Sequence, residues 1–275
     1  MKTAFSVLLA AILILLLAGC ADNPSPPPTE TTVPPAVQVA PVTAPPTTAP
    51  PTEPPFPFAS GHHLMRYDSE TWGDYLEYYL HIPEQAEDGL PLVIFLHGDG
   101  EVGNTEGLAC YGLMKKAREY YGEEFPFIAI TPCTRTISWV QDSIHGTLTE
   151  LIAQVASECH VDTEKIIITG HSRGAIGVWN LISLYGDYFS AAVPVSCDCG
   201  DRRIDYTNAA KVPVWAIVGG EGELDQKYAS SMAWMCNQIT AAGGSAQFTV
   251  LWDNYHNETC ENAFTEELFQ WMLSQ

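Results

Sequence analysis

From residue 75 to residue 273, short apolar runs alternate with longer stretches whose apolar side chains recur at helical spacing. Short continuous apolar runs are typical of strands buried within a parallel sheet. The predicted strands are Tyr75–Ile82, Pro91–Leu96, Phe127–Thr131, Lys165–Thr169, Ala191–Val195, Val214–Val218 and Gln247–Leu251.

The stretches between these runs have the periodicity of amphipathic helices. The predicted helices are Gly107–Tyr120, Thr147–Ser157, Ala175–Leu184, Gln226–Ala241 and Ala263–Leu273. Strands and helices that alternate at this spacing predict an α/β domain, in which helices cover both faces of a mostly parallel sheet.

The N-terminal segment has the features of an export signal. Lys2 precedes an apolar run from Leu8 to Leu17, which is too short for a typical membrane span and suits a signal-peptide core. Leu17-Ala18-Gly19-Cys20 resembles the lipobox of bacterial lipoproteins, in which cleavage precedes the cysteine. We therefore expect residues 1–20 to be a signal peptide. A lipidated Cys20 would hold the protein on the extracytoplasmic face of the cell membrane.

Residues 21–57 are rich in Pro, Thr and Ala and contain few large apolar side chains. Such a segment cannot build a core, so it is predicted to be a disordered, semi-rigid tether. The remaining residues, 58–275, have the size of a single globular domain.

Charge and cysteine content narrow the function. The formal net charge is −21, so the clustered Lys and Arg that nucleic-acid binding requires are missing. Seven cysteines follow Cys20, and the sequence does not reveal whether any of them pair. Cys197-x-Cys199 lacks a second pair at zinc-ligand spacing, and no metal site is predicted.

Gly170-His171-Ser172-Arg173-Gly174 is a G-x-S-x-G sequence between a predicted strand and a predicted helix. This strand–turn–helix context is that of the nucleophile elbow of α/β-hydrolases. Ser172 is therefore the predicted nucleophile. The amide of Arg173, at the start of the helix, is a predicted oxyanion donor.

A second glycine-rich loop, from Leu96 to Glu101, follows the buried strand Pro91–Leu96. Glycines at such a position let backbone amides face a ligand. The amides of Asp99 and Gly100 are the candidates for the second oxyanion donor. The side chain of His97 is expected to have a structural role.

A serine nucleophile needs a base, and the base needs an orienting carboxylate. His256 lies between the last predicted strand and the last helix, where the base is expected, whereas the side chain of His171 should point away. Three acids follow the strand Val214–Val218. Glu223 is preferred, Asp225 comes second because it could simply cap the next helix, and Glu221 is third.

These motifs carry a family likeness. The loop Leu96–Asn104 resembles the LHGxGExG loop of secreted bacterial esterases related to feruloyl esterases and polyhydroxybutyrate depolymerases, and the segments Val161–Trp179 and Phe189–Cys197 are similar to their elbow region and the following strand. The sequence departs from that family in two respects: Ala175 replaces a glycine, and the segment GGEGELD (219–225) replaces the compact acid motif.

The resemblance implies a serine hydrolase of small or carbohydrate-linked carboxylic esters that needs no cofactor. Trp139 is a candidate for lining the acyl or sugar pocket, although a tryptophan in such a position more often belongs to the core. Two other functions stay open. One is a peptidase or amidase on the same scaffold; the other is a non-catalytic, carbohydrate-binding surface lipoprotein, against which the intact Ser172 and His256 argue.

Overall fold

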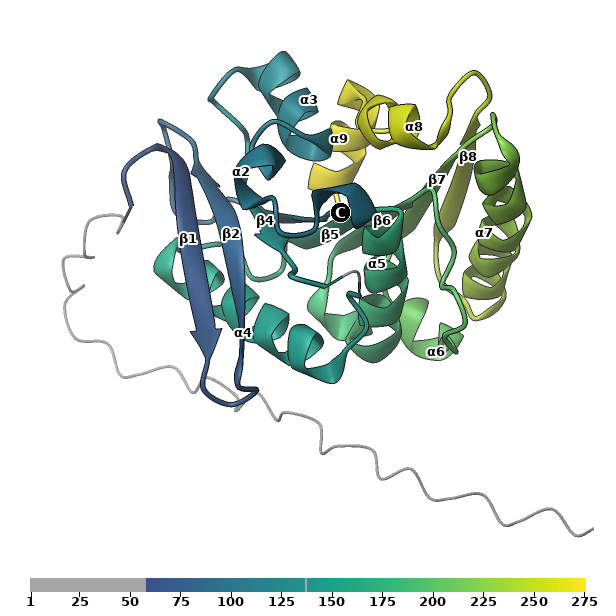
Figure 1. Cartoon of the computed structure of the whole chain (residues 1–275), viewed down its shortest axis with the longest axis horizontal. Helices are drawn as coiled ribbons and strands as arrows, with labels where there is room; N and C mark the ends of the chain where they lie inside the picture. The colour runs from purple at the N-terminus through teal and green to yellow at the C-terminus, as the bar shows by residue number, and fades with distance from the viewer. Residues whose placement is uncertain (1–57, 137) are drawn as a thin grey trace, which may run out of the picture. The chain divides into compact units, whose positions relative to one another are not determined.

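The computed structural model describes residues 58–136 and 138–275, so the predicted signal peptide, Cys20 and the tether lie outside the described residues. An eight-stranded sheet runs through this part of the chain in the order β1-β2-β4-β3-β5-β6-β7-β8 (Figure 1). The β1–β2 and β2–β4 pairs are antiparallel and the other five pairs are parallel. The strands are β1 Gly61–Ser69, β2 Asp74–Ile82, β3 Leu92–Leu96, β4 Ile128–Cys133, β5 Ile166–His171, β6 Ala191–Val195, β7 Val214–Gly219 and β8 Ala246–Leu251.

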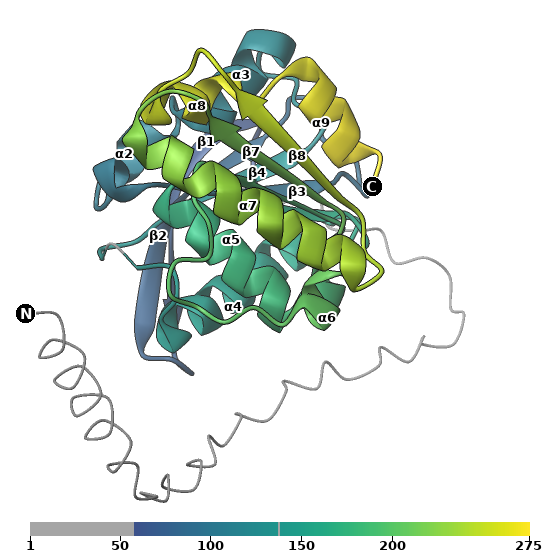
Figure 2. The same ribbon diagram turned by 90° about the vertical axis from the view of Figure 1, so that its right-hand side faces the viewer.

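Helices cover both faces of the sheet, with α4, α5 and α7 on one face and α3, α8 and α9 on the other (Figures 1 and 2). The longer helices are α3 Gly112–Tyr121, α4 Asp142–Glu158, α5 Arg173–Leu184, α7 Glu223–Ala241, α8 His256–Asn262 and α9 Glu266–Leu273. The short ones are η1 Asp99–Glu101, α2 Thr105–Leu108, η2 Gly186–Tyr188 and α6 Tyr206–Ala209.

Strand β3 shows how the apolar runs create two cores. All five of its residues are buried, and alternate side chains of a strand point to opposite faces. Leu92, Ile94 and Leu96 belong to the core under α4 and α5, whereas Val93 and Phe95 belong to the core under α3 and α9. The prediction of a mostly parallel sheet covered on both faces is confirmed.

The structure differs from the predicted elements in several places; helix α8 was not predicted, and α4 begins at Asp142, five positions before the predicted start at Thr147. Strand β1 was not predicted, because its residues are only partly buried and its sequence is mostly polar. The predicted helix Gly107–Tyr120 is divided into α2 and α3, since Gly112 has φ of 52°, which starts a new helix. Helix α7 begins at Glu223, three positions before the predicted start at Gln226.

The seven cysteines between Cys110 and Cys260 are free thiols. Within residues 58–136 and 138–275, no helix is both long enough and apolar enough to cross a membrane.

Helix α5 packs unusually close to β3, and two of its glycines permit this. A Cβ atom on Gly174 would overlap the carbonyl oxygen of Leu96, and one on Gly177 would lie 2.7 Å from the Cβ of Trp139. Neither neighbour can move without displacing the strand or the core. The start of α5 is thereby fixed against the end of β3.

We therefore expect Gly174→Ala to lower the free energy of unfolding by more than about 3 kcal/mol, because the new methyl group meets backbone. Urea denaturation followed by circular dichroism measures this loss. Gly100→Ala is the control, since a Cβ on Gly100 meets nothing within 4 Å. Equal stability of the two variants would contradict the close approach of α5.

Candidate active site

Six parallel strands end at the same edge of the sheet, and the candidate residues lie in segments that follow them. Ser172 lies directly between β5 and α5, with φ of 55° and ψ of −117°. A non-glycine residue at positive φ is strained, and such strain persists only where the surroundings enforce it. Here the Ser172 amide donates to the Val195 carbonyl at 2.8 Å, and the Ser172 carbonyl accepts from the Ala175 amide at 2.9 Å.

His256, the first residue of α8, lies between Ser172 and a carboxylate. The Nε2 atom of His256 is 2.9 Å from Oγ of Ser172, and its Nδ1 atom is 2.6 Å from Oδ1 of Asp225. With the carboxylate ionised, Nδ1–H donates to Asp225 and Nε2 accepts the serine hydroxyl proton. A hydroxyl group held in this way can pass its proton to the imidazole as it attacks an electrophile.

Asp225 is the acid that the structure brings to His256. Its side chain is fully buried, and Ser196 Oγ donates to its other oxygen at 3.3 Å. Asp225 lies in the first turn of α7, where the helix dipole stabilises a negative charge.

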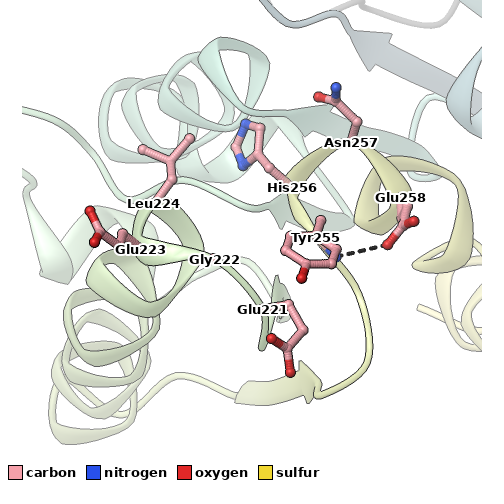
Figure 3. A pocket seen from close by; sticks show the side chains of 8 residues that line it. All are labelled: Glu221, Gly222, Glu223, Leu224, Tyr255, His256, Asn257 and Glu258. Atoms are coloured by element: carbon pink, nitrogen blue, oxygen red, sulfur yellow. Dashed lines mark hydrogen bonds between the residues drawn. The ribbon is translucent and has the colours of Figure 1, made fainter.

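The prediction of Glu223 as the partner of His256 is wrong. Because α7 begins at Glu223, Asp225 follows two positions later, and two helical residues point in nearly opposite directions. Glu223 is therefore exposed while Asp225 faces the sheet. Figure 3 shows the carboxylates of Glu223 and Glu221 pointing away from the His256 ring.

His171 has a structural position next to this chain of hydrogen bonds. Its ring is buried, its centroid is 4.8 Å from that of His256, and its Nε2–H donates to the backbone carbonyl of His256 at 2.9 Å. Burial and the neighbouring His256 lower its pKa from 6.5 to about 3. As expected, His171 does not take the place of the base, and it ties the start of α8 to the end of β5.

The loop after β3 lies directly against Ser172, since a Cβ on Gly98 would be 3.3 Å from the Cβ of Ser172. His97 shapes this loop: its Nδ1–H donates to the Gly98 carbonyl at 2.6 Å, and its Nε2 accepts from the Thr134 amide at 3.0 Å. The structural role expected for His97 agrees with these contacts.

Asp99 and Gly100 are the first residues of η1, and Arg173 is the first residue of α5. The first amides of a helix have no partner within it, so these three are free of intrahelical hydrogen bonds. The Gly98 amide, in contrast, donates to Oε2 of Glu101 at 3.1 Å. Sequence reasoning missed this role of Glu101, and the only signal was its place in the loop motif.

On the inner side of the loop, the Glu101 carboxylate accepts the hydrogen bond from the Gly98 amide and so fixes the loop backbone. Burial raises the pKa of its carboxyl group, and the Gly98 amide and the Tyr111 hydroxyl oppose that rise by donating hydrogen bonds to it. On the outer side of the loop, Nε of Arg173 is 3.2 Å from Oδ1 of Asp99. Because both of those side chains are about half exposed, this ion pair contributes little to stability.

Trp139 belongs to the core. It is 2% exposed, its indole N–H donates to the His97 carbonyl at 2.9 Å, and its ring packs edge-on against the His97 ring. The prediction that Trp139 lines a substrate pocket is wrong, because the ring presents almost no surface to a ligand. Its contacts instead support the loop that faces Ser172.

A depression of about 550 Å³ lies where the segment after β7 meets the start of α8 (Figure 3). His256 is part of its wall, so a molecule in the depression can approach the imidazole. Its lining residues are Glu221, Gly222, Glu223, Leu224, Tyr255, His256, Asn257 and Glu258. Leu224 and Tyr255 are among the exposed large hydrophobic residues.

No family model and no curated protein matches the chain. Solved structures do. A thermostable esterase matches 78% of this chain over 63% of its own, with a TM-score of 0.66 and 21% identity. The chain therefore spans less than two thirds of the length of that esterase. The chain has the α/β-hydrolase fold.

Two further α/β-hydrolase structures match with a TM-score of 0.57 and 16% identity. One is a feruloyl esterase module from Clostridium thermocellum in complex with sinapinate, where the match covers 73% of this chain and 83% of the module. The other is a fluorophosphonate-binding serine hydrolase of Staphylococcus aureus, where the match covers 79% of this chain and the whole of that one.

The buried His171 predicts how stability depends on pH. In the unfolded chain a histidine binds a proton near pH 6.5, whereas folded His171 stays neutral down to about pH 3. The unfolded state therefore binds more protons, and stability falls as the pH is lowered from 6.5, by at most about 1.4 kcal/mol per pH unit for one group.

We expect His171→Gln to lose less stability than the wild type between pH 6.5 and pH 4, as measured by urea denaturation at each pH. Glutamine keeps an N–H donor for the His256 carbonyl but does not titrate. The control is His63→Gln, at a partly exposed position on β1. Parallel curves for the wild type and His171→Gln would show that His171 does not contribute.

Proposed function

We propose that the protein is a serine hydrolase that cleaves carboxylic esters through an acyl-enzyme on Ser172. The observation that carries this proposal is the continuous chain of hydrogen bonds from Ser172 Oγ through His256 to the buried Asp225. The strained elbow, the free amides beside it and the likeness to esterase structures support it.

In the proposed reaction, Ser172 Oγ attacks the ester carbonyl carbon while its proton passes to Nε2 of His256. Asp225 stabilises the imidazolium that forms and holds the ring in the required orientation. The negative charge on the carbonyl oxygen is stabilised by the Arg173 amide together with that of Asp99 or Gly100. Amides at the start of a helix are fixed in direction by that helix, so we expect little rearrangement to be needed to stabilise the oxyanion.

The tetrahedral intermediate then collapses, and His256 gives its proton to the departing alcohol. Water attacks the acyl-enzyme in the second half of the reaction, with His256 again accepting a proton. The carboxylic acid leaves and Ser172 regains its hydrogen. Every proton in this cycle moves through Nε2 of His256, so the reaction needs no cofactor.

Small or carbohydrate-linked esters are the substrate class that we propose. The feruloyl esterase module among the similar structures supports this class, since its structure contains sinapinate. The depression beside His256 is open, and the exposed Leu224 and Tyr255 offer apolar contact to an acyl or sugar group. We further propose that lipidated Cys20 anchors the enzyme at the extracytoplasmic membrane surface, on the basis of the lipobox-like sequence alone.

The first test uses the purified full chain with a fluorophosphonate probe and a matched pair of substrates, p-nitrophenyl acetate and p-nitroacetanilide. We expect labelling and ester turnover, with the ester preferred over the anilide. Ser172→Ala should abolish labelling and lower kcat/KM roughly 10⁴-fold or more.

Ser274→Ala, at an exposed residue near the C-terminus, should leave both readouts unchanged. A folded wild type that neither labels nor turns over would refute the proposed function. In that case glycan arrays would test for a carbohydrate-binding lipoprotein. Faster cleavage of the anilide would point instead to an amidase.

The identity of the acid is tested by a pair of isosteric variants. Asp225→Asn should lower kcat/KM about 10³–10⁴-fold, because an amide cannot stabilise the imidazolium or hold the required tautomer. Glu223→Gln, in which an exposed carboxylate two positions away changes in the same manner, should stay within about twofold of the wild type. The opposite ranking would return Glu223 to the role of partner of His256.

A further inference from the structure

A cluster of metal-ligating side chains lies outside the candidate active site. His62 on β1 and His81 on β2 are directly opposite each other in the antiparallel pair, and Glu123 lies between α3 and β4. One ring nitrogen from each histidine and one oxygen of Glu123 lie within 4.8 Å of one another. Strands β1 and β2, and the elements α3 and β4 on either side of Glu123, are labelled in Figure 1.

This cluster is near the opposite end of the sheet from Ser172. His81 pairs with Ala129, which through β3 is level with Ile167 on β5. Ser172 follows Ile167 by five positions, about 17 Å along the strand, and β4 and β3 lie between β2 and β5. The cluster therefore cannot contribute to chemistry at Ser172.

His81 is the anomaly that calls for a ligand. Its side chain is fully buried, and neither ring nitrogen makes a well-formed hydrogen bond. The ring is packed between the His62 ring at 4.5 Å and the Phe125 ring at 3.9 Å. A buried polar atom without a partner costs stability, so it requires an explanation such as an ion.

Both histidines are in the form that binds metals. Burial lowers the pKa of His81 to about 4 and also lowers that of His62, in spite of the nearby Glu123 carboxylate. Neutral imidazole is the form that binds a metal ion, and His62 binds through Nε2 in the tautomer that carries its proton on Nδ1. Burial raises the pKa of Glu123, but its contacts with His62 and Arg118 outweigh burial, so the net shift is downward.

The spacing of the ligand atoms suits a small tetrahedral ion. With bonds near 2.0–2.1 Å, the ligand atoms of a tetrahedral zinc site are about 3.3 Å apart. Oε2 of Glu123 is 2.9 Å from Nε2 of His62 and 4.0 Å from Nδ1 of His81. These two distances bracket the required value, and the ligand nitrogens of the two histidines lie no more than 4.8 Å apart, so side-chain shifts of about 1–1.5 Å would complete the site.

Among the described residues, Arg118 is the one cation in contact with this cluster. Its guanidinium group has to move away from His62 before a metal ion can bind there. Its Nη2 atom lies 2.6 Å from Nε2 of His62. Its other contacts, from Nε to Oε1 of Glu123 at 2.9 Å and from Nη1 to the Ala109 carbonyl at 3.1 Å, leave Oε2 free. A small rotation therefore opens His62 to a metal while Arg118 continues to orient the carboxylate, as outer partners of metal ligands do.

We propose that His62, His81 and Glu123 bind one zinc ion, with water as the fourth ligand. Two imidazoles and one carboxylate favour zinc over calcium or magnesium, which prefer sites made of oxygen alone. The ion joins the edge strand β1 to β2 and to the segment before β4. The sequence predicts no metal here, because the three ligands are far apart along the chain.

The test is isothermal titration of the full chain with zinc chloride, without an affinity tag that contains histidines. All proteins carry Cys110→Ser, since Cys110 is an exposed thiol near Arg118 and could bind zinc by itself. We expect one zinc ion per chain. His62→Gln and Glu123→Gln should each weaken binding at least tenfold. His63→Gln, the neighbouring histidine on the same strand, should bind as the wild type does.

A second measurement tests whether the bound ion, which joins β1 to β2 and to the segment before β4, stabilises the fold. At free zinc about 100-fold above Kd, the melting temperature of the wild type should rise by about 5 °C, and that of His81→Phe should not change. Phenylalanine fills the place of the buried ring beside Phe125 without a ligand atom, and circular dichroism in EDTA checks its fold. The proposal is overturned if the wild type takes up no zinc, or if His62→Gln and Glu123→Gln bind it as tightly as the wild type.

Discussion

The left-handed backbone of Ser172 is the constraint on which the arrangement of the site depends. A residue at φ of 55° between a strand and a helix reverses the chain within one position, which leaves its side chain clear of both elements. The reversal needs space that only glycine provides: Cβ atoms on Gly170 and Gly174 would collide with the helix start and with β3. The cores on the two faces of the sheet hold β5 and α5 in place and thereby sustain the strain.

The other polar groups of the site depend on the same edge of the sheet. Parallel strands end together, so segments that are far apart in the sequence become neighbours there. Ser172 follows β5, Ser196 follows β6, Asp225 follows β7 and His256 follows β8. His171 and Glu101 add contacts that fix the backbone of α8 and of the loop after β3. The side chains proposed to react are thus held in place by neighbouring polar groups that take no part in the proposed reaction.

The sequence was sufficient for those parts of the site that depend on local pattern. A G-x-S-x-G motif after an apolar run indicates an elbow, and a histidine after the last strand indicates the base position. Asp225 could not be ranked above Glu223, because the choice depends on where α7 begins, and a shift of three residues rotates the whole acidic segment. Trp139 was ambiguous for a similar reason, since its burial depends on contacts with His97 and Gly177 that no periodicity encodes. Strand β1 was missed because an edge strand does not need an apolar run.

The acidic lining of the depression beside His256 affects the two ends of the proposed reaction differently. Glu221, Glu223 and Glu258 are exposed there, and the chain as a whole carries a net charge of −21. A neutral ester enters such a field without cost, whereas the carboxylate released from it is repelled at once. Electrostatic repulsion would therefore speed release of the carboxylate product and weaken its rebinding, which the reverse, ester-forming reaction requires. The same field would exclude esters that already carry a negative charge close to the bond that is cleaved.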